Sequence, residues 1–142
     1  MRAVVDTNIL VSGLLGMYTS SARLIDMIYI GRIQCVYDDR ILSEYKEVLA
    51  REKFKPVISE KERKDLLHYL SLSGIPVFCS PLEGYSNKAP DPFDLPFVEA
   101  AVAGHAACII TGNARHFSFF RNNPWQIGIL SPRQCYTLIC DG

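Results

Sequence analysis

Short apolar runs that alternate with helical patterns are the feature that most restricts the fold of this chain. Five runs rich in apolar and β-branched residues predict strands, and amphipathic segments separate them. The predicted strands are Ala3–Val5, Ile33–Tyr37, Ile75–Phe78, Cys108–Ile110 and Ile127–Leu130. Strands that alternate with helices predict an α/β fold with a parallel sheet covered on both faces. The nearly continuous apolar character of the runs fits strands buried on both sides.

Residues that can cap a helix stand at the start of several predicted helices. Ser59 and Glu62 have the spacing of a capping box, and Ser131 and Gln134 repeat it around a first-turn proline. The predicted helices extend from Ser20 to Ile30, from Asp38 or Asp39 to about Phe54, from Ser59 to near Gly74, and onward from Ser131. A loop over residues 79–92 precedes a further helix.

The composition is that of a globular protein, with 142 residues, 49% of them hydrophobic and 21% charged. This length suits one domain, which we assign to residues 1–142. A formal net charge of zero argues against a strongly basic nucleic-acid binder and leaves room for a local basic patch. No apolar run of about 18 residues occurs, and Asp6 comes too early for a signal peptide. We therefore expect a cytoplasmic protein that does not enter a membrane.

Cysteine and basic residues give no sign of a site of their own. The five cysteines are odd in number and lack CxxC or CxH spacing, so we expect buried thiols in a reducing compartment at Cys35, Cys79 and Cys108. The basic residues between Lys46 and Lys64 are interleaved with acidic ones, which is typical of a solvated helix face.

Polar residues follow two of the predicted strands and precede one helix. Asp6 ends the first strand, and Thr111, Gly112 and Asn113 follow the fourth. In an open parallel sheet, sites form beyond the carboxyl ends of the strands, so these side chains should meet at one edge. Asp94 projects onto the apolar stripe of the helix that follows it and should face the interior, whereas Asp91 lies off that stripe.

Each of these residues also has a purely structural interpretation. Asp6 and Asp94 could cap the helices that they precede. Asn113 beside a glycine is common turn material. Glu44 lies at the border of a buried helical stripe and can reach inward, but it could instead form a surface pair with Arg40. Buried ionised carboxylates are rare without a partner, which favours a functional role for Asp6.

Acidic residues gathered at one edge would repel one another and raise at least one pKa. A divalent cation would remove that cost, and carboxylate, carbonyl and water oxygens suit Mg²⁺ or Mn²⁺ rather than zinc. The sequence therefore predicts a cation site at this edge of the sheet.

Four stretches, in this order, resemble the PIN-domain family of metal-dependent nucleases. They are VVDTNIL (Val4–Leu10), ILSEYKEVL (Ile41–Leu49), DPFDLPFVEAAVAG (Asp91–Gly104) and IITGNARHF (Ile109–Phe117). The resemblance is closest to the bacterial and archaeal branch that contains the toxins of VapC-type toxin–antitoxin modules. It implies a three-layer α/β/α fold with strand order 3-2-1-4-5, which brings Asp6 next to Asn113.

The resemblance assigns roles to individual residues. Asp6, Glu44 and Asp94 match the family's acids and are expected to be the catalytic residues, which bind one or two Mg²⁺ or Mn²⁺ ions. Asn113 replaces the acid of a TGD motif, so a second ion should bind more weakly while activity is retained. The expected reaction is hydrolysis of RNA phosphodiester bonds by metal-activated water.

The resemblance also suggests supporting residues and partners. Thr111 is expected to add a hydroxyl near the site, and Asn8 to fix the Asp6 loop by hydrogen bonds. Arg115 and His116 are candidates for contacts with a substrate phosphate, with a structural role as the alternative for His116. The expected partners are the RNA substrate, a small antitoxin protein, and a second copy of the chain in a homodimer or larger assembly.

Two other functions fit parts of the pattern. A non-catalytic PIN-like module that binds RNA or protein would explain Asn113 as a degraded metal ligand, although three acids are retained. A phosphatase with an aspartate nucleophile would need the DxD pairing, but the residue two after Asp6 is Asn8. Binding without turnover would favour the first, and release of phosphate from a small ester, without RNA cleavage, the second.

Overall fold

The computed structural model describes residues 1–141 and contains a five-stranded parallel sheet. The strands are β1 (Arg2–Val5), β2 (Gln34–Tyr37), β3 (Ile75–Pro76), β4 (Cys108–Ile110) and β5 (Gly128–Leu130). Their order is β3-β2-β1-β4-β5, and every neighbouring pair is parallel. The predicted α/β fold and strand order are therefore confirmed.

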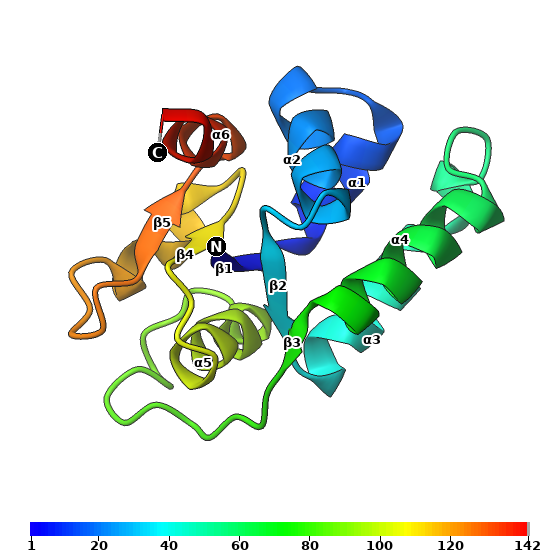
Figure 1. Ribbon diagram of the computed structural model, residues 1–142. Helices are drawn as coiled ribbons and strands as arrows, with labels where there is room; N and C mark the ends of the chain where they lie inside the picture. Colours follow the sequence, from blue (N-terminus) through cyan, green and yellow to red (C-terminus); the bar gives the residue numbers. More distant parts are fainter. Residues whose placement is uncertain (142) are drawn as a thin grey trace.

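Helices cover the sheet on both faces. They are α1 (Thr7–Leu15), α2 (Thr19–Tyr29), α3 (Asp39–Leu49), α4 (Glu60–Ser73), α5 (Leu95–Ala103) and α6 (Pro132–Asp141), with 3-10 turns η1 (Glu52–Phe54), η2 (Pro92–Asp94) and η3 (Ala114–Phe120). Figure 1 shows α1, α2 and α6 on one side of β1, α5 on the other, and α3 and α4 beside β2 and β3. None of the helices in residues 1–141 has the length and apolar character needed to span a bilayer.

Capping interactions explain where three helices begin. The Glu62 amide donates to Ser59 Oγ at 3.0 Å, and the Ile41 amide donates to Asp38 Oδ1 at 3.0 Å. Ser131 and Gln134 exchange two hydrogen bonds between their backbone amides and side chains, at 2.8 and 3.1 Å. The predicted capping boxes are therefore confirmed, and Asp38 is the residue that caps α3.

Two element ends differ from the prediction. The helix expected to reach Phe54 ends at Leu49, and the separate turn η1 follows it. The third strand stops at Pro76 instead of Phe78, since Pro76 lacks an N–H group and the Phe78 side chain is fully exposed at this sheet edge. Apolar character alone did not distinguish an edge segment from a buried strand.

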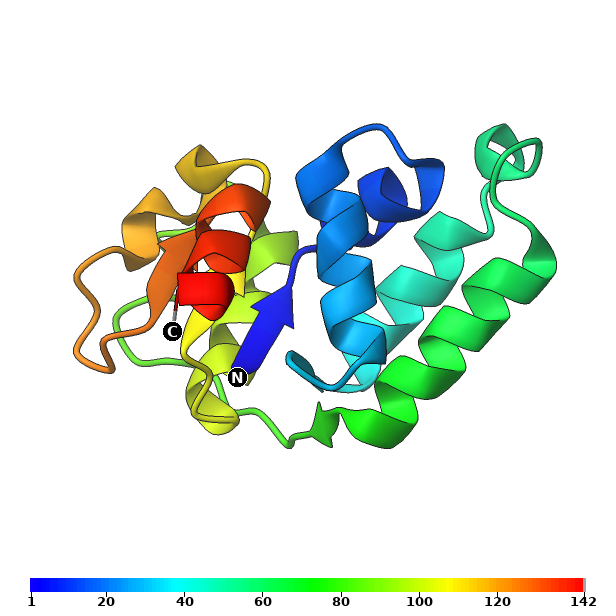
Figure 2. The ribbon, with the colours of Figure 1, turned by 45° about the horizontal axis from the view of Figure 1, so that its top comes forward.

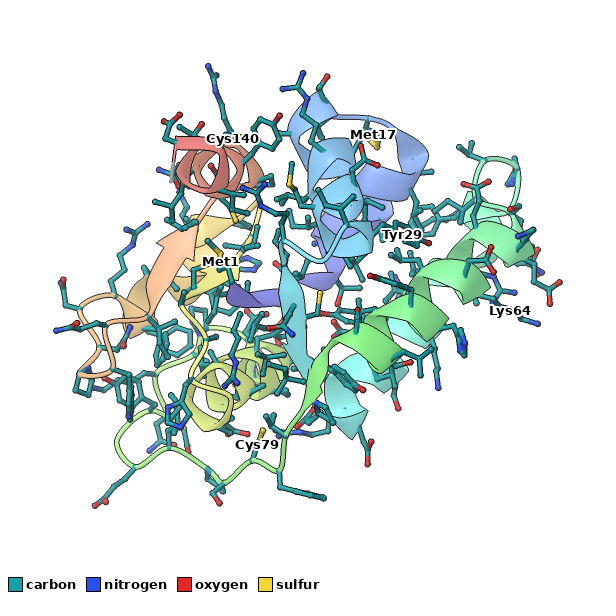
Figure 3. The ribbon with its side chains drawn as sticks, viewed as in Figure 1. Met1, Met17, Tyr29, Lys64, Cys79 and Cys140 are labelled. Atoms are coloured by element: carbon teal, nitrogen blue, oxygen red, sulfur yellow. The ribbon has the colours of Figure 1, made fainter. Side chains whose placement is uncertain are left out.

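The cysteines are all free thiols. Cys35 and Cys108 are buried as expected, whereas Cys79 is only half-buried on the loop after β3. Cys140 is exposed on α6, so the two cysteines labelled in Figure 3 lie on different parts of the surface.

Pairing between the central strands fixes the positions of the residues that follow them. Val5 on β1 pairs with Ile110 on β4, and the Asp6 amide extends this ladder by donating to the Ile110 carbonyl at 2.9 Å. Asp6 and Thr111 therefore stand side by side at the carboxyl edge of the sheet.

Candidate active site

Thr111 connects the end of β1 to the loop after β4. Its hydroxyl donates to Asp6 Oδ2 at 2.8 Å and accepts from the Asn113 amide at 3.0 Å. Thr111 is 1% exposed, so both hydrogen bonds lie at the base of the site. The hydroxyl expected from the sequence is thus present and orients Asp6 directly.

Asp6 carries its carboxyl group in a mostly buried position. Burial raises the pKa of Asp6, and the hydrogen bond from Thr111 opposes this effect. Asp6 occupies the N-cap position of α1, but its side chain makes no capping hydrogen bond. The backbone amides of Asn8 and Thr7 nevertheless lie near the Asp6 carboxylate and oppose the rise in its pKa, so a place at the start of α1 and a role in the site are compatible.

Glu44 reaches the same edge from α3. The Thr7 hydroxyl donates a hydrogen bond to Glu44 Oε2, which ties this carboxylate to the residue after Asp6. On the next residue of the helix, the Tyr45 hydroxyl donates to the carbonyl of Val5. Glu44 is half-buried, in agreement with its position at the border of the apolar stripe, while Glu47 is exposed.

The surface pair considered for Glu44 and Arg40 does not form. The Arg40 guanidinium instead contacts Asp38 Oδ2 at 2.7 Å and Glu99 Oε1 at 2.8 Å. Both carboxylates are buried, so they compete for Arg40 more effectively than a half-exposed Glu44 one helical turn away. Glu44 is therefore free to point toward Asp6.

Asp94 lies where η2 meets α5. Its side chain is 14% exposed, and its Oδ2 atom is buried without a hydrogen-bond partner. Burial, followed by the negative charges of Asp6 and Asp91, raises the pKa of Asp94 to about 6. Asp94 makes no capping hydrogen bond, and Asp91 accepts the Phe93 amide at 3.0 Å instead.

His116 contacts two of the predicted site residues. Its Nδ1 atom lies 3.7 Å from Asp94 Oδ2, and its Nε2 atom lies 3.1 Å from the side-chain nitrogen of Asn113. The ring is 51% exposed on η3, so it faces the site from the solvent side. The contacts on η3 are compatible both with a helix-associated structural role and with a role toward the substrate.

Asn8 and Arg115 stand apart from this set of contacts. The Asn8 side chain makes no hydrogen bond to another residue in the range 1–141, whereas its backbone amide lies near the Asp6 carboxylate. It lines a cavity of about 380 Å³ together with Asp6 and Asn113. Arg115 is exposed and forms no ion pair with any residue in this range.

Contacts thus link the predicted acids in a continuous series. Glu44 bonds to Thr7, the neighbour of Asp6; Asp6 bonds through Thr111 to Asn113; and His116 lies between Asn113 and Asp94. Within the described part of the chain, no three His, Cys, Asp or Glu side chains are arranged as a formed metal site. The potential metal-ligating atoms of the predicted site are oxygens. The Oδ2 atom of Asp94, which accepts no hydrogen bond from a described residue, is the kind of ligand that a hard cation binds.

The sequence did not predict the contact between Thr7 and Glu44, or the ion pairs of Arg40 with the buried carboxylates of Asp38 and Glu99. For Glu99 a signal was available, because it is the only charged residue in the apolar helix α5 and acids are almost never buried unpaired. For Thr7 the position directly after Asp6 offered no indication that its hydroxyl would reach α3.

The comparison with protein families gives a match over most of the chain. A family model described as PIN domain matches residues 2–115. This range includes the three predicted acids of the site and Asn113. Searches of curated proteins and of solved structures found no significant match. PIN domains are generally nucleases, and they commonly use divalent metals. The match, together with the strand order and the acids at the carboxyl edge, shows that the chain belongs to the PIN-domain family.

Proposed function

We propose that this protein is a metal-dependent endoribonuclease that hydrolyses RNA phosphodiester bonds. Asp6, Glu44 and Asp94 would act as catalytic residues and hold Mg²⁺ or Mn²⁺, with Asn113 as a neutral fourth ligand. Membership of the PIN-domain family supports nuclease chemistry. The assignment of individual residues is supported by their contacts at the carboxyl edge of the sheet.

The observation that carries this proposal is the Oδ2 atom of Asp94. A buried carboxylate oxygen without a donor is costly, and here the nearby charges of Asp6 and Glu44 increase the cost. The nearby ring of His116 offsets part of this cost, and protonation of the acid or a bound cation would offset more of it. When bound, a divalent cation would lower the pKa of a water molecule and stabilise negative charge on the phosphoryl oxygens.

The neighbouring residues would hold the ligands in place. The hydrogen bond from Thr111 fixes the rotamer of Asp6, and the hydroxyl of Thr7 holds Glu44 close to it. His116, beside Asp94, can donate a hydrogen bond to a substrate phosphate from the solvent side. Asn113 brings one negative charge fewer than an acid, which disfavours a second ion more than the first.

Cleavage of a single-stranded RNA by the purified protein tests this proposal. Asp6→Asn and Asp94→Asn should each abolish cleavage in Mg²⁺ or Mn²⁺, since each removes a charged ligand while keeping the side-chain shape. Asp91→Asn, in the same DPFD segment, should cleave normally. Wild-type cleavage in EDTA, or unchanged cleavage in both site variants, would sink the assignment.

We further propose that the protein acts in the cytoplasm as the toxin of a toxin–antitoxin module. The support is the resemblance of its four motif stretches to the VapC-type branch, whose members pair with small antitoxins and form homodimers. Expression in a bacterial host should arrest growth, and Asp94→Asn should relieve the arrest. A neighbour-encoded small protein that binds the toxin should relieve it as well. Continued growth with soluble, RNA-cleaving protein would contradict the toxin role.

A non-catalytic binding module is the second candidate. It is favoured by the absence of a formed three-ligand group in residues 1–141 and by the amide at Asn113. This candidate predicts RNA binding that Mg²⁺ does not change and no cleavage products after long incubation.

A further inference from the structure

Two cavities adjoin between the N-terminal ends of α2 and α6. The first, of about 380 Å³, contains Asp6 and Asn113 in its lining and extends to Tyr18, Ser20 and Ser131. The second, of about 420 Å³, is lined by Tyr18, Thr19, Ser20, Arg23, Arg133, Tyr136 and Thr137. Because Tyr18 and Ser20 line both, the two cavities are neighbours, and we call them together the α2–α6 groove. Figure 2 shows α2 and α6 next to each other on the same side of β1.

The part of the groove that lies farther from Asp6 is lined by positively charged side chains. Asp6 is the only acidic residue lining either cavity, and the far end carries Arg23 and Arg133. Both arginines are exposed, and neither forms an ion pair with the residues that the structure describes. Their guanidinium groups are therefore available to external phosphates, even though the chain has no net charge.

The more conspicuous basic surface, on α3 and α4, differs in this respect. Lys64, which projects from the outer side of α4 in Figure 3, pairs with Glu60, and Lys61 pairs with Asp65 at 2.7 Å. Arg51 pairs with Glu47 at 3.2 Å. These partners neutralise Arg51, Lys61 and Lys64 locally. Lys46 and Arg63 form no ion pair with a described residue, but they line a separate cavity that contains none of the predicted site residues.

Aromatic side chains accompany the arginines of the groove. Tyr18 is 62% exposed, and the Arg23 guanidinium lies 5.0 Å from the centroid of the Tyr136 ring. Exposed tyrosines and stacked guanidinium planes bind unpaired bases, because every base offers a flat face. A duplex hides these faces between its base pairs, so this combination favours a single strand.

The junction of the two cavities offers hydrogen-bond donors. The α2 helix begins at Thr19 without a side-chain cap, and its first turn contains no acid. Ser21 is 2% exposed, lines the first cavity, and makes no side-chain hydrogen bond to another described residue. A backbone phosphate passing this point would meet both the free amides of α2 and an unpartnered hydroxyl.

We infer that single-stranded RNA binds along the α2–α6 groove on its way to the acids. Arg23 and Arg133 contact its phosphates, and the exposed ring of Tyr18, which lines both cavities, stacks against a base. The inference rests on the proposed function for the reaction at Asp6, but the binding path is separate from that chemistry. It assigns the substrate to the α2–α6 side of the site rather than to the basic helices α3 and α4.

Fluorescence anisotropy with a labelled single-stranded RNA oligonucleotide tests the path. The measurement uses Asp94→Asn protein in EDTA, which prevents cleavage and reduces repulsion. Replacing Arg23 and Arg133 by alanine should weaken binding about tenfold or more. The slope of log K against log salt should fall by about 1.4, since each phosphate contact with a single strand contributes about 0.7. The matched control, Arg63→Ala with Lys64→Ala on α4, should bind as before.

Further variants keep the inference testable if the double variant is unstable. Arg133→Glu changes one exposed side chain and should weaken binding at least as strongly. Tyr18→Ala should weaken single-strand binding about tenfold, whereas Tyr18→Phe, which keeps the ring, should not. Any of three results would overturn the inference. They are equal effects in the groove and control variants, unchanged binding after Arg133→Glu, and duplex binding as tight as single-strand binding.

The two proposals can fail separately. If wild-type protein cleaves RNA, the groove variant Arg23→Ala with Arg133→Ala should raise KM about tenfold and leave kcat within about twofold. Unchanged KM would overturn the groove and leave the nuclease proposal intact. If wild-type protein does not cleave RNA, the nuclease proposal fails, while weaker RNA binding by the groove variants would still support the path.

Discussion

The carboxyl group of Asp94 is placed where ionisation is unfavourable unless a cation is present. Its pKa is raised to about 6 because it is buried and because Asp6, Asp91 and Glu44 surround it with negative charge. An acid whose pKa is higher in the folded than in the unfolded protein binds its proton more tightly when folded. In the absence of metal, its contribution to stability therefore falls as the pH rises from about 4 through 6.

Replacing Asp94 by asparagine should therefore stabilise the metal-free protein at neutral pH. In EDTA, the stabilisation of the variant over wild type should be about 1–2 kcal/mol larger at pH 7.5 than at pH 5.0. Urea unfolding at both pH values measures this. Asp26→Asn, on the exposed face of α2, is the control variant. The same difference in both variants would mean that Asp94 is not strained by its surroundings.

Asn113 is the one position where the chain departs from the TGD pattern. Restoring the acid with Asn113→Asp adds a charged oxygen ligand beside Asp6, so Mn²⁺ should bind several-fold more tightly at pH 7.5. Isothermal titration calorimetry measures this affinity, and Asn87→Asp in the loop before η2 controls for the added charge. Equal or weaker affinity in Asn113→Asp would show that this side chain does not face the ion.

At the scale of elements, the packing of α1 against α2 places the groove next to the site. Gly13 lies at this contact, where an added Cβ would come within 2.6 Å of Ile25 Cγ1 and 2.9 Å of the Ser21 carbonyl. The Ser21 carbonyl belongs to a helix backbone and cannot move alone. The two helices can approach this closely only because residue 13 has no side chain.

Gly13→Ala should therefore destabilise the protein, although alanine is the better helix former. The gain from helix propensity is about 1 kcal/mol, whereas overpacking typically costs about 1–3 kcal/mol. We expect a net loss of about 1 kcal/mol in chemical denaturation. Gly112→Ala is the control, because a Cβ there would meet only Ile9 at 3.7 Å and the backbone has no positive φ. A stability equal to wild type in Gly13→Ala would show that α2 shifts freely.

Elements with local signals were predictable, and those set by tertiary contacts were not. The capping residues Ser59 and Ser131 mark real helix starts, because their hydrogen bonds are made within one turn. The early end of α3 and the short strand β3 depend on solvent exposure at the sheet edge. The chain bends at Gly112 before Asn113, in a conformation that does not require glycine.

At the scale of the whole molecule, the site is assembled from residues far apart in the sequence. Asp6, Glu44, Asp94 and Thr111 each follow a different strand or lie on a different helix, and the parallel sheet brings them together. The sequence predicted this meeting because all parallel strands end at the same edge. It did not predict Thr7, and it named His116 as a candidate phosphate contact without predicting that the ring would lie between Asn113 and Asp94.

A cation at this site should consequently stabilise the entire fold. At a concentration about a hundred times its dissociation constant, Mn²⁺ should add about 2.7 kcal/mol and raise Tm by roughly 5–10 °C. Calorimetric melting of wild-type protein with and without Mn²⁺ measures this change. Asp6→Asn with Asp94→Asn should lose it. An equal rise in that variant would place the bound ion elsewhere.

The hydrogen bond from the Tyr45 hydroxyl to the Val5 carbonyl has a consequence for how the site can move. Together with the bond between Thr7 and Glu44, it attaches α3 to the end of β1 at two successive helix residues. Asp6 and Glu44 are therefore held at a fixed position relative to each other. Asp94 follows residues 77–91, which contain no helix or strand. We therefore expect any change in the distance between the acids as a ligand enters to occur on the side of Asp94, through the segment that precedes it.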